Sequence, residues 1–278
     1  GVQLVHTDQQ SSGIAFLNGT RVDVSLGDSY WLVLPSMNAN LRFPNDFVVR
    51  FAASRQIQRP RLDQLRSAIG YGIDTTSRPV PFISGGGGNP TLRPYLANAV
   101  DLNLEKYFGG TGYVALQLFY KKFTSFISDG RDENFDYSAF PLPVGVTPPS
   151  LIGRLDAPVN TDGGKMYGAE VAATLPLSVL TSALDGFGLT GGVGYTKTRV
   201  EDFNGNQTQI PGYSKWVANG TAFFEKWGFN ARGSVRYRST FLGDFTGFGG
   251  SPTRRIALDE TIYDQVGRTF LAAYKLKF

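Results

Sequence analysis

The chain lacks residues that many active sites depend on, and each absence excludes a class of protein. It contains no cysteine, which excludes disulfides, thiolate catalysis and cysteine-ligated metals. A Ser-His-Asp arrangement would have to be built on His6, the only histidine, which lies near the start of the chain on an expected strand. Histidine-rich metal centres are excluded for the same reason. We therefore predict that the chain is not an enzyme and that it needs no metal or cofactor.

Long apolar runs and charge runs are also missing. No stretch approaches the ~20 apolar residues that a membrane-spanning helix needs, so any membrane crossing has to be made by strands. The net charge is only +4, and the two signs are interspersed without a basic run. Nucleic acid is therefore not an expected partner.

The chain is rich in residues that suit strands and tight turns. It holds 34 glycines, and 13% of its residues are aromatic. Apolar and polar side chains alternate with period two in segment after segment, as where Val114, Leu116 and Leu118 oppose Ala115 and Gln117. About ten strands are expected on this basis, at residues 2–7, 37–43, 47–54, 100–105, 114–121, 168–175, 189–196, 215–225, 229–238 and 269–278. Alternation over ten or so residues is typical of outer-membrane barrels.

The last ten residues carry the strongest signal. Phe278, Leu276 and Tyr274 fall on one face of an extended strand, whereas Lys277 and Lys275 fall on the other. An aromatic face suits lipid and a lysine-bearing face suits a wet lumen. We therefore expect a closing barrel strand, ending at Phe278, that a barrel-assembly machinery recognises. An amphipathic edge strand of a soluble sandwich is the alternative.

The connections alternate strictly in length. Short links are expected at residues 44–46, 109–111, 180–185 and 226–228, and long links at 11–29, 58–95, 128–162, 200–213 and 243–266. Short periplasmic turns and long extracellular loops are typical of membrane barrels. We expect the long links to lack cores of their own, with one short helix where Leu62, Leu65 and Ile69 share a face.

These patterns predict an all-β protein, an antiparallel transmembrane β-barrel with about ten strands. It would be part of a larger barrel or a reduced one, with residues 1–278 forming one outer-membrane β-barrel domain. Two alternatives stay open. One is a small passive pore or structural barrel, and the other is a soluble β-sheet carbohydrate-binding module.

Two groups of residues are candidates for function. Aromatic rings next to polar groups can grip ligands, although they also serve in loop packing or an aromatic girdle. The candidates for ligand contact in the outer loops are Tyr71, Phe82, Phe135, Tyr137, Phe203 and Phe245. Charged side chains on the lumen faces would line a passage or pair with one another, and these are Arg50, Asp101, Glu105, Arg232, Arg236 and Arg238.

Several motifs, in order along the chain, are similar to those of one family. They are Arg50-Phe51-Ala52-Ala53-Ser54, Gly88-Asn89-Pro90-Thr91-Leu92-Arg93-Pro94, Gly163-Gly164-Lys165 with Gly168-Ala169-Glu170, Ile210-Pro211-Gly212-Tyr213-Ser214-Lys215, Tyr237-Arg238-Ser239 and Gly267-Arg268-Thr269-Phe270. The set resembles the C-terminal barrel of TonB-dependent outer-membrane transporters. The sequences of these motifs are most similar to those of one branch of the family, many of whose members are thought to import plant-derived sugars.

The resemblance implies a function in the outer membrane of a Gram-negative bacterium. The whole protein would take up a nutrient, with an oligosaccharide and a siderophore as the two ligand classes, and would be energised by TonB through an N-terminal plug. The partners implied are outer-membrane lipid, the unidentified nutrient, and TonB only through the plug. The plug and about half of the family's 22 strands are absent from this sequence. A strand beginning at Arg254 runs almost directly into Gly267, which resembles an internal deletion of one strand pair.

Overall fold

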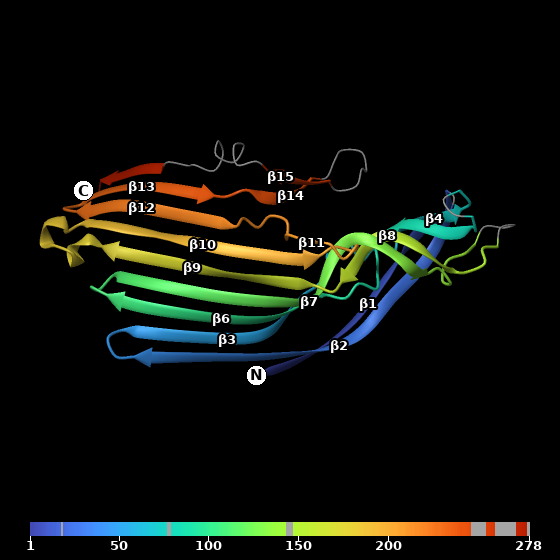
Figure 1. The fold of residues 1–278 in the computed structure, drawn as a ribbon, viewed down its shortest axis with the longest axis horizontal. Coiled ribbons are helices and arrows are strands. Elements are labelled where there is room, and N and C mark those ends of the chain that lie inside the picture. The colour runs from blue at the N-terminus through green and yellow to red at the C-terminus, as the bar shows by residue number, and fades with distance from the viewer. Residues whose placement is uncertain (18, 77–78, 143–146, 246–253, 259–270, 277–278) are drawn as a thin grey trace.

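Sixteen strands and two short 3₁₀ helices make up the computed structural model (Figure 1). It describes residues 1–278 except 18, 77–78, 143–146, 246–253, 259–270 and 277–278, and it describes side chains through residue 243. Fourteen strands form one sheet, whereas β14 (Phe241–Phe245) and β15 (Arg254–Leu258) form a separate hairpin. The all-β prediction is confirmed.

All ten expected strands are present, and they form a wall in which each pairs antiparallel with the next. They are β1 (Val2–Leu17), β2 (Thr20–Phe43), β3 (Phe47–Gln58), β6 (Tyr95–Phe108), β7 (Gly112–Asp136), β9 (Gly164–Pro176), β10 (Phe187–Glu201), β12 (Trp216–Lys226), β13 (Phe229–Arg238) and β16 (Leu271–Leu276). Of the described strands, β16 pairs only with β13, so the two edges of the wall do not join each other.

The two faces of the wall differ across the whole sheet, because residues paired in register share a face. One row on the outer face runs through Leu41, Val49, Leu104, Leu116, Val171, Val193, Ala218 and Tyr237. A row on the lumen face runs through Arg42, Val48, Glu105, Ala115, Ala172, Gly192, Asn219 and Arg236. The outer row is apolar throughout and the lumen row is mixed, as a membrane barrel requires.

Aromatic pairs mark both ends of the apolar face. The ring centroids of Phe187 and Phe224 lie 4.5 Å apart near the short turns, and those of Tyr195 and Trp216 lie 4.8 Å apart toward the long connections. Such rings are favoured where a membrane barrel meets the two water interfaces.

The short links all lie at one end of the wall, on the left in Figure 1. The β2–β3 turn holds Asn45 and Asp46 at positive φ, and the β12–β13 turn does the same with Trp227 and Gly228. The link from β9 to β10 contains the two 3₁₀ helices, η1 (Leu177–Val179) and η2 (Ser182–Leu184). The predicted sorting of short and long connections to opposite ends is confirmed.

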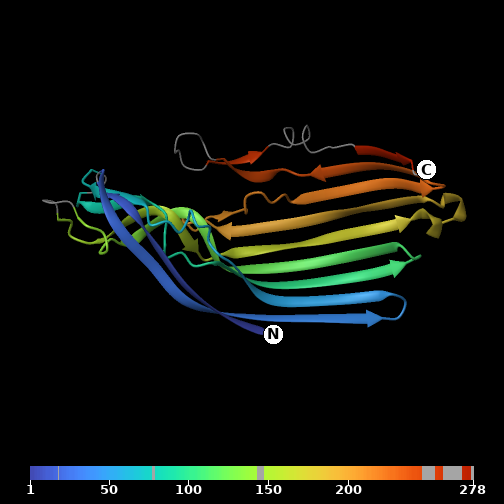
Figure 2. The same ribbon diagram turned by 180° about the vertical axis from the view of Figure 1, so that it is seen from behind.

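The long links differ from the prediction, because most of them contain strands. Residues 11–17 and 20–29 belong to β1 and β2, whose pairing continues to Leu17 opposite Thr20. The other links contribute β4 (Ile69–Asp74), β5 (Phe82–Gly87), β8 (Ile152–Thr161) and β11 (Gln207–Thr208). At the far end from the short turns, β4 pairs with β1, β5 with β4, and β8 with both β5 and β7. We call β4, β5, β8 and the adjoining ends of β1, β2 and β7 the outer ring (Figure 2).

The outer ring has a core, which corrects the expectation that the long links form none. Buried side chains from six ring strands and the segment after β7 meet there, and they are Ala15, Leu17, Val24, Ile69, Tyr71, Ile83, Phe135, Tyr137, Phe140, Leu155 and Ala157. The short helix expected at residues 60–69 is also wrong. The Leu65 N–H donates to the Arg61 carbonyl at 3.3 Å, which makes a single helical turn. Leu62 is 87% exposed, however, and Ile69 is fully buried in β4, so Leu62, Leu65 and Ile69 share no face.

No helix in the described ranges is long and apolar enough to cross a membrane. The small self-closed barrel receives no support from the pairing, because the β16 edge and the β1 edge of the wall stay apart.

Candidate functional site

Three of the predicted ligand aromatics lie in the ring core instead of on an accessible surface. Tyr71, Phe135 and Tyr137 are between 0% and 7% exposed. The Tyr71 hydroxyl donates to the Pro141 carbonyl at 2.7 Å, and the Tyr137 hydroxyl donates to the Arg154 carbonyl at 2.7 Å. Burial raises the pKa of both phenols above the ordinary value. The prediction of ligand contact at these three positions is corrected, since their rings and hydroxyls are already used in packing.

The remaining predicted aromatics have different surroundings. Phe82 is half-buried on β5, with the Arg154 guanidinium 5.5 Å from its ring centroid. Phe203 is 44% exposed at the turn after β10. The side chain of Phe245 lies outside the described residues. Phe203 is therefore the candidate that a ligand can reach.

Two adjacent hollows open beside Phe203 in the outer ring. The first holds about 980 Å³ and is lined by Arg66, Asp129, Asp156 and other residues, and the second holds about 530 Å³ and is lined by Asn89, Thr91, Asn160 and others. Both are bordered by Arg131, Asp202 and Phe203. We call the two together the outer cavity. Its lining residues come from β7, β8, the end of β10 with the turn that follows, the end of β5 with the segment after it, and Arg66 before β4.

Local sequence explains how Phe203 is presented. The Asp202 carboxylate accepts from the backbone N–H groups of Asn204 and Asn206, both at 2.9 Å. Gly205 follows at a φ of +78°, so the chain reverses tightly. An Asp that caps its own turn, followed by a glycine in the left-handed region, is a favoured turn chemistry. The turn holds Phe203 at its tip, against Gly130 of β7, where an added Cβ would lie 2.5 Å from the Phe203 Cβ.

The segment Gly88–Pro94 fixes the opposite side of the outer cavity. The Asn89 side chain accepts from the Thr91 N–H at 3.1 Å and donates to the Pro158 carbonyl at 3.1 Å. Across the strands, the Gln9 amide donates to the carbonyls of Pro90 and Leu92 at 2.9 and 2.8 Å. This motif therefore ties β1 and β8 together at the entry to β6.

The outer cavity is acidic. Six carboxylates and two guanidinium groups line it, and the carboxylates belong to Asp129, Asp132, Asp156, Asp162, Glu201 and Asp202. Arg131 donates to Asp156 at 2.6 Å and lies 4.0 Å from Glu133. The hydrogen bond to Asp156, with the nearby charges, raises the pKa of the Arg131 guanidinium. Among the residues that the structure describes, no group of three metal-ligating side chains is placed to hold an ion.

The lumen face carries paired charges, as one of the open alternatives supposed. Arg50 donates to both carboxylate oxygens of Glu105, at 2.9 and 3.2 Å. Asn103 and Tyr107 donate to the same carboxylate at 2.7 and 2.9 Å, so the buried Glu105 is fully engaged. This network joins β3 to β6 inside the wall.

The other lumen candidates lie further along the same face. Arg232 pairs with Glu225, and Arg238 donates to the Ser214 hydroxyl at 2.7 Å. Asp101 is half-buried opposite Phe119, and Arg236 is exposed opposite Asn219. The structure places all six on the lumen face, but it brings only Arg50 and Glu105 into contact with each other.

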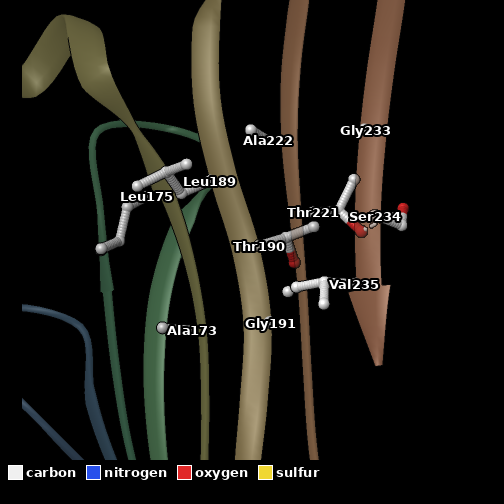
Figure 3. Close-up of a pocket in the computed structure, with 11 residues that line it drawn as sticks. Ala173, Leu175, Leu189, Thr190, Gly191, Thr221, Ala222, Gly233, Ser234 and Val235 are labelled. Carbon is white, nitrogen blue, oxygen red and sulfur yellow. Dashed lines mark hydrogen bonds between the residues drawn. The ribbon is translucent and has the colours of Figure 1, made fainter. Parts of the chain in front are cut away.

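A third hollow, of about 710 Å³, lies on the outer face of β9, β10, β12 and β13 (Figure 3). Gly191, Gly220 and Gly233 line it without side chains. Leu175 and Leu189 stand at one side. No charged group lines it. Apart from the hydroxyls of Thr190, Thr221 and Ser234 it offers a ligand apolar contact, on the face that the apolar rows assign to lipid.

An antiparallel wall with one apolar and one mixed face, short turns at one end and an elaborate outer end defines the class: a portion of a membrane β-barrel. The sequence profile "TonB dependent receptor-like, beta-barrel" matches residues 1–269, so the chain belongs to the family of TonB-dependent receptor barrels. Barrels of this family lie in the outer membrane of Gram-negative bacteria, and its members are transporters and not enzymes. The soluble carbohydrate-binding module is thereby ruled out.

Solved structures share the fold at low sequence identity. The ferric enterobactin receptor PfeA of Pseudomonas aeruginosa, a mutant in complex with enterobactin, is similar with a TM-score of 0.58 at 16% identity, over 93% of this chain and 34% of that one. The siderophore receptor PirA of Acinetobacter baumannii gives 0.52 at 11%, over 98% and 38%. The chain thus spans little more than a third of the length of these receptors. No curated protein matches the sequence.

Proposed function

We propose that the chain is the C-terminal part of the barrel of a TonB-dependent transporter that takes up a nutrient, and that the outer cavity receives this nutrient. The observation that carries the proposal is the outer cavity itself, placed in the outer ring at the far end from the short periplasmic turns. In this reading the coupling to TonB belongs to a plug, as the family resemblance implies, and the wall supplies the passage.

The lining of the outer cavity favours an oligosaccharide over an anion. Six carboxylates against two guanidinium groups give a negative potential, which repels anionic ligands. Carboxylates, amides and hydroxyls accept and donate hydrogen bonds to the hydroxyls of a sugar. The exposed Phe203 ring offers an apolar face on which a sugar ring can stack.

A siderophore is the second candidate, because the similar solved structures are receptors for ferric enterobactin and other siderophores. At 11–16% identity, that similarity concerns the fold alone. The chemistry of the outer cavity therefore decides the order of the two candidates.

The experiment compares two ligands on the receptor expressed from its complete reading frame. Calorimetric titration in detergent with maltohexaose and with ferric enterobactin is expected to give the higher affinity for the neutral sugar. Phe203→Ala should weaken sugar binding roughly tenfold through the lost stacking surface. Phe187→Ala, the same truncation on the outer face near the short turns, is the control and should leave binding unchanged. Tighter binding of ferric enterobactin, or equal effects of the two truncations, would contradict the sugar assignment.

A further inference from the structure

A row of cations crosses the outer face of the wall. Arg55 of β3 is paired with Asn98 of β6, which is paired with Lys122 of β7. Lys122 is paired in turn with Lys165 of β9, and Lys165 with Arg199 of β10. The five side chains project from the same face because each lies directly opposite the next. We call the four cations Arg55, Lys122, Lys165 and Arg199 the basic row.

The basic row lies on the face that meets lipid, just beyond the aromatic end of the apolar band. Two positions below it, the register places Val100, Tyr120, Tyr167 and Lys197. Two positions below those come Leu118, Ala169 and Tyr195. Arg199 is four residues past Tyr195, which is ~13 Å along a strand and ~10 Å along the membrane normal at a tilt of about 40°. That height corresponds to the headgroup layer outside the hydrocarbon.

The charge of the basic row is not balanced within the protein. Like charges directly opposite one another on neighbouring strands destabilise a sheet. None of the ion pairs in the described ranges involves Lys122, Lys165 or Arg199, and all three are exposed. The Arg55 Nε is buried without a hydrogen-bond partner. The row therefore carries an electrostatic cost that an external anion would relieve.

A hollow of about 250 Å³ lies within the row, where the end of β10 pairs with β11. Lys122, Lys165 and Arg199 line it together with Tyr120 and Gln207, and its one carboxylate belongs to Glu201. Three cations against one acid leave it net positive. It is thus a concave, cationic site at headgroup height on the outside of the barrel.

We propose that the basic row binds the phosphate groups of lipid headgroups in the outer leaflet. Arginine presents a planar fork that fits phosphate oxygens, and the two lysines supply compact charges on flexible stems. The tyrosines one row lower meet the first part of the acyl chains. The site lies on the outer face of the wall, away from the lumen, and it shares only Glu201 with the lining of the outer cavity.

The test uses the receptor expressed from its complete reading frame and purified in a non-ionic detergent. The probe is a diphosphorylated lipid A, titrated and counted by native mass spectrometry. The variant Lys122→Gln/Lys165→Gln/Arg199→Gln is compared with Arg42→Gln/Lys121→Gln/Arg236→Gln, which removes three cations from the lumen face. Each cation removed from the row should cost roughly fivefold in affinity, and all three on the order of 100-fold, whereas the lumen-face variant should stay near wild type. The charge-preserving Lys122→Arg/Lys165→Arg/Arg199→Lys variant should also bind.

Lipid A without its phosphates and inorganic phosphate complete the design. Binding that depends on both the phosphates and the row supports the proposal. Equal affinity of the two triple glutamine variants overturns it, as does undiminished binding of the dephosphorylated lipid. Inorganic phosphate that displaces lipid A at equal concentration shows a free-anion site, and capture of an acidic protein in preference to lipid shows a protein interface; either result also overturns it. Heat-modifiable migration on a gel verifies that each variant is folded.

Discussion

Val171→Arg is expected to be one of the most damaging single substitutions on the outer face. Val171 is 40% exposed on β9, four positions from Tyr167 and four from Leu175. Four positions are ~13 Å along a strand, or ~10 Å along the membrane normal at the usual tilt, so the site is near the bilayer midplane. An arginine there should cost about 2–4 kcal/mol of unfolding free energy.

The neighbouring substitution Ala172→Arg supplies the control, since Ala172 shares a row with Glu105 and Arg236 on the lumen face. A guanidinium in the wet lumen should cost less than about 1 kcal/mol. The measurement is guanidinium unfolding of the receptor in phospholipid vesicles, followed by tryptophan fluorescence. Equal costs at the two positions, or a larger cost at Ala172, would refute the assignment of the two faces.

Three further predictions concern the ends of the wall. Tyr137→Ala should destabilise the outer ring by about 3–5 kcal/mol through the cavity it leaves, and Tyr137→Phe by about 1–3 kcal/mol through an unpaired carbonyl, measured as hydrogen exchange of β8 amides. The Lys226 ammonium lies 2.8 Å from the Asp185 carboxylate at the periplasmic end, and its hydrogen bond lowers the pKa of Asp185. The pair therefore stabilises the folded state above the ordinary carboxyl pKa of about 4, and this stabilisation is lost as the pH falls through the lowered pKa. Lys226→Gln should therefore flatten the stability profile below about pH 4, and an unchanged profile would exclude this pair as its source. Gly163→Ala should cost more than about 1 kcal/mol in thermal unfolding, because Gly163 has a φ of +89° and an added Cβ would collide with a β7 carbonyl, whereas Gly70→Ala, with open space and ordinary φ, should be tolerated.

Period-two alternation made the wall predictable, because lipid on one side and a wet lumen on the other impose opposite demands on successive side chains. That constraint ends where the strands leave the bilayer. Gln9, Gln10, Ser11 and Ser12 face water or protein on both sides, so they show no alternation and read as a loop, yet they belong to β1. Strand ends beyond the membrane are therefore poorly predicted by a pattern that the membrane creates.

The glycine-rich strand of the outer ring was not predicted, for a different reason. Gly85, Gly86 and Gly87 lie in the link at residues 58–95, where no strand was expected, but they form half of β5. An added Cβ on Gly85 would lie 2.7 Å from the Tyr137 hydroxyl, and one on Gly87 would lie 2.5 Å from the Ala68 carbonyl. The glycines allow backbones to approach closely, and that requirement appears only when partners distant in sequence are known.

The candidate sites also differ in whether their residues lie on strands that are neighbours in the wall. The pairing of Arg50 with Glu105 follows from two strands that are neighbours in the wall, which the sequence predicts. The outer cavity brings together β7, β8 and the turn after β10, whose proximity depends on parallel and long-range pairings. Arg131 and Asp202 were missed for this reason, although the Asp-Phe-Asn-Gly turn at residues 202–205 is a local signal that predicts an exposed Phe203.

The outer ring also imposes an order on biogenesis. Its aromatic core joins segments separated by more than a hundred residues, and all of them have to arrive on the cell surface before they can pack. A finished core around Tyr137 is too bulky and too polar at its edges to be drawn through a bilayer, so the wall strands must thread first and the ring must condense afterwards, outside the cell. A receptor with a damaged ring core would then still be inserted in the membrane, and its surface segments would be open to a protease added from outside.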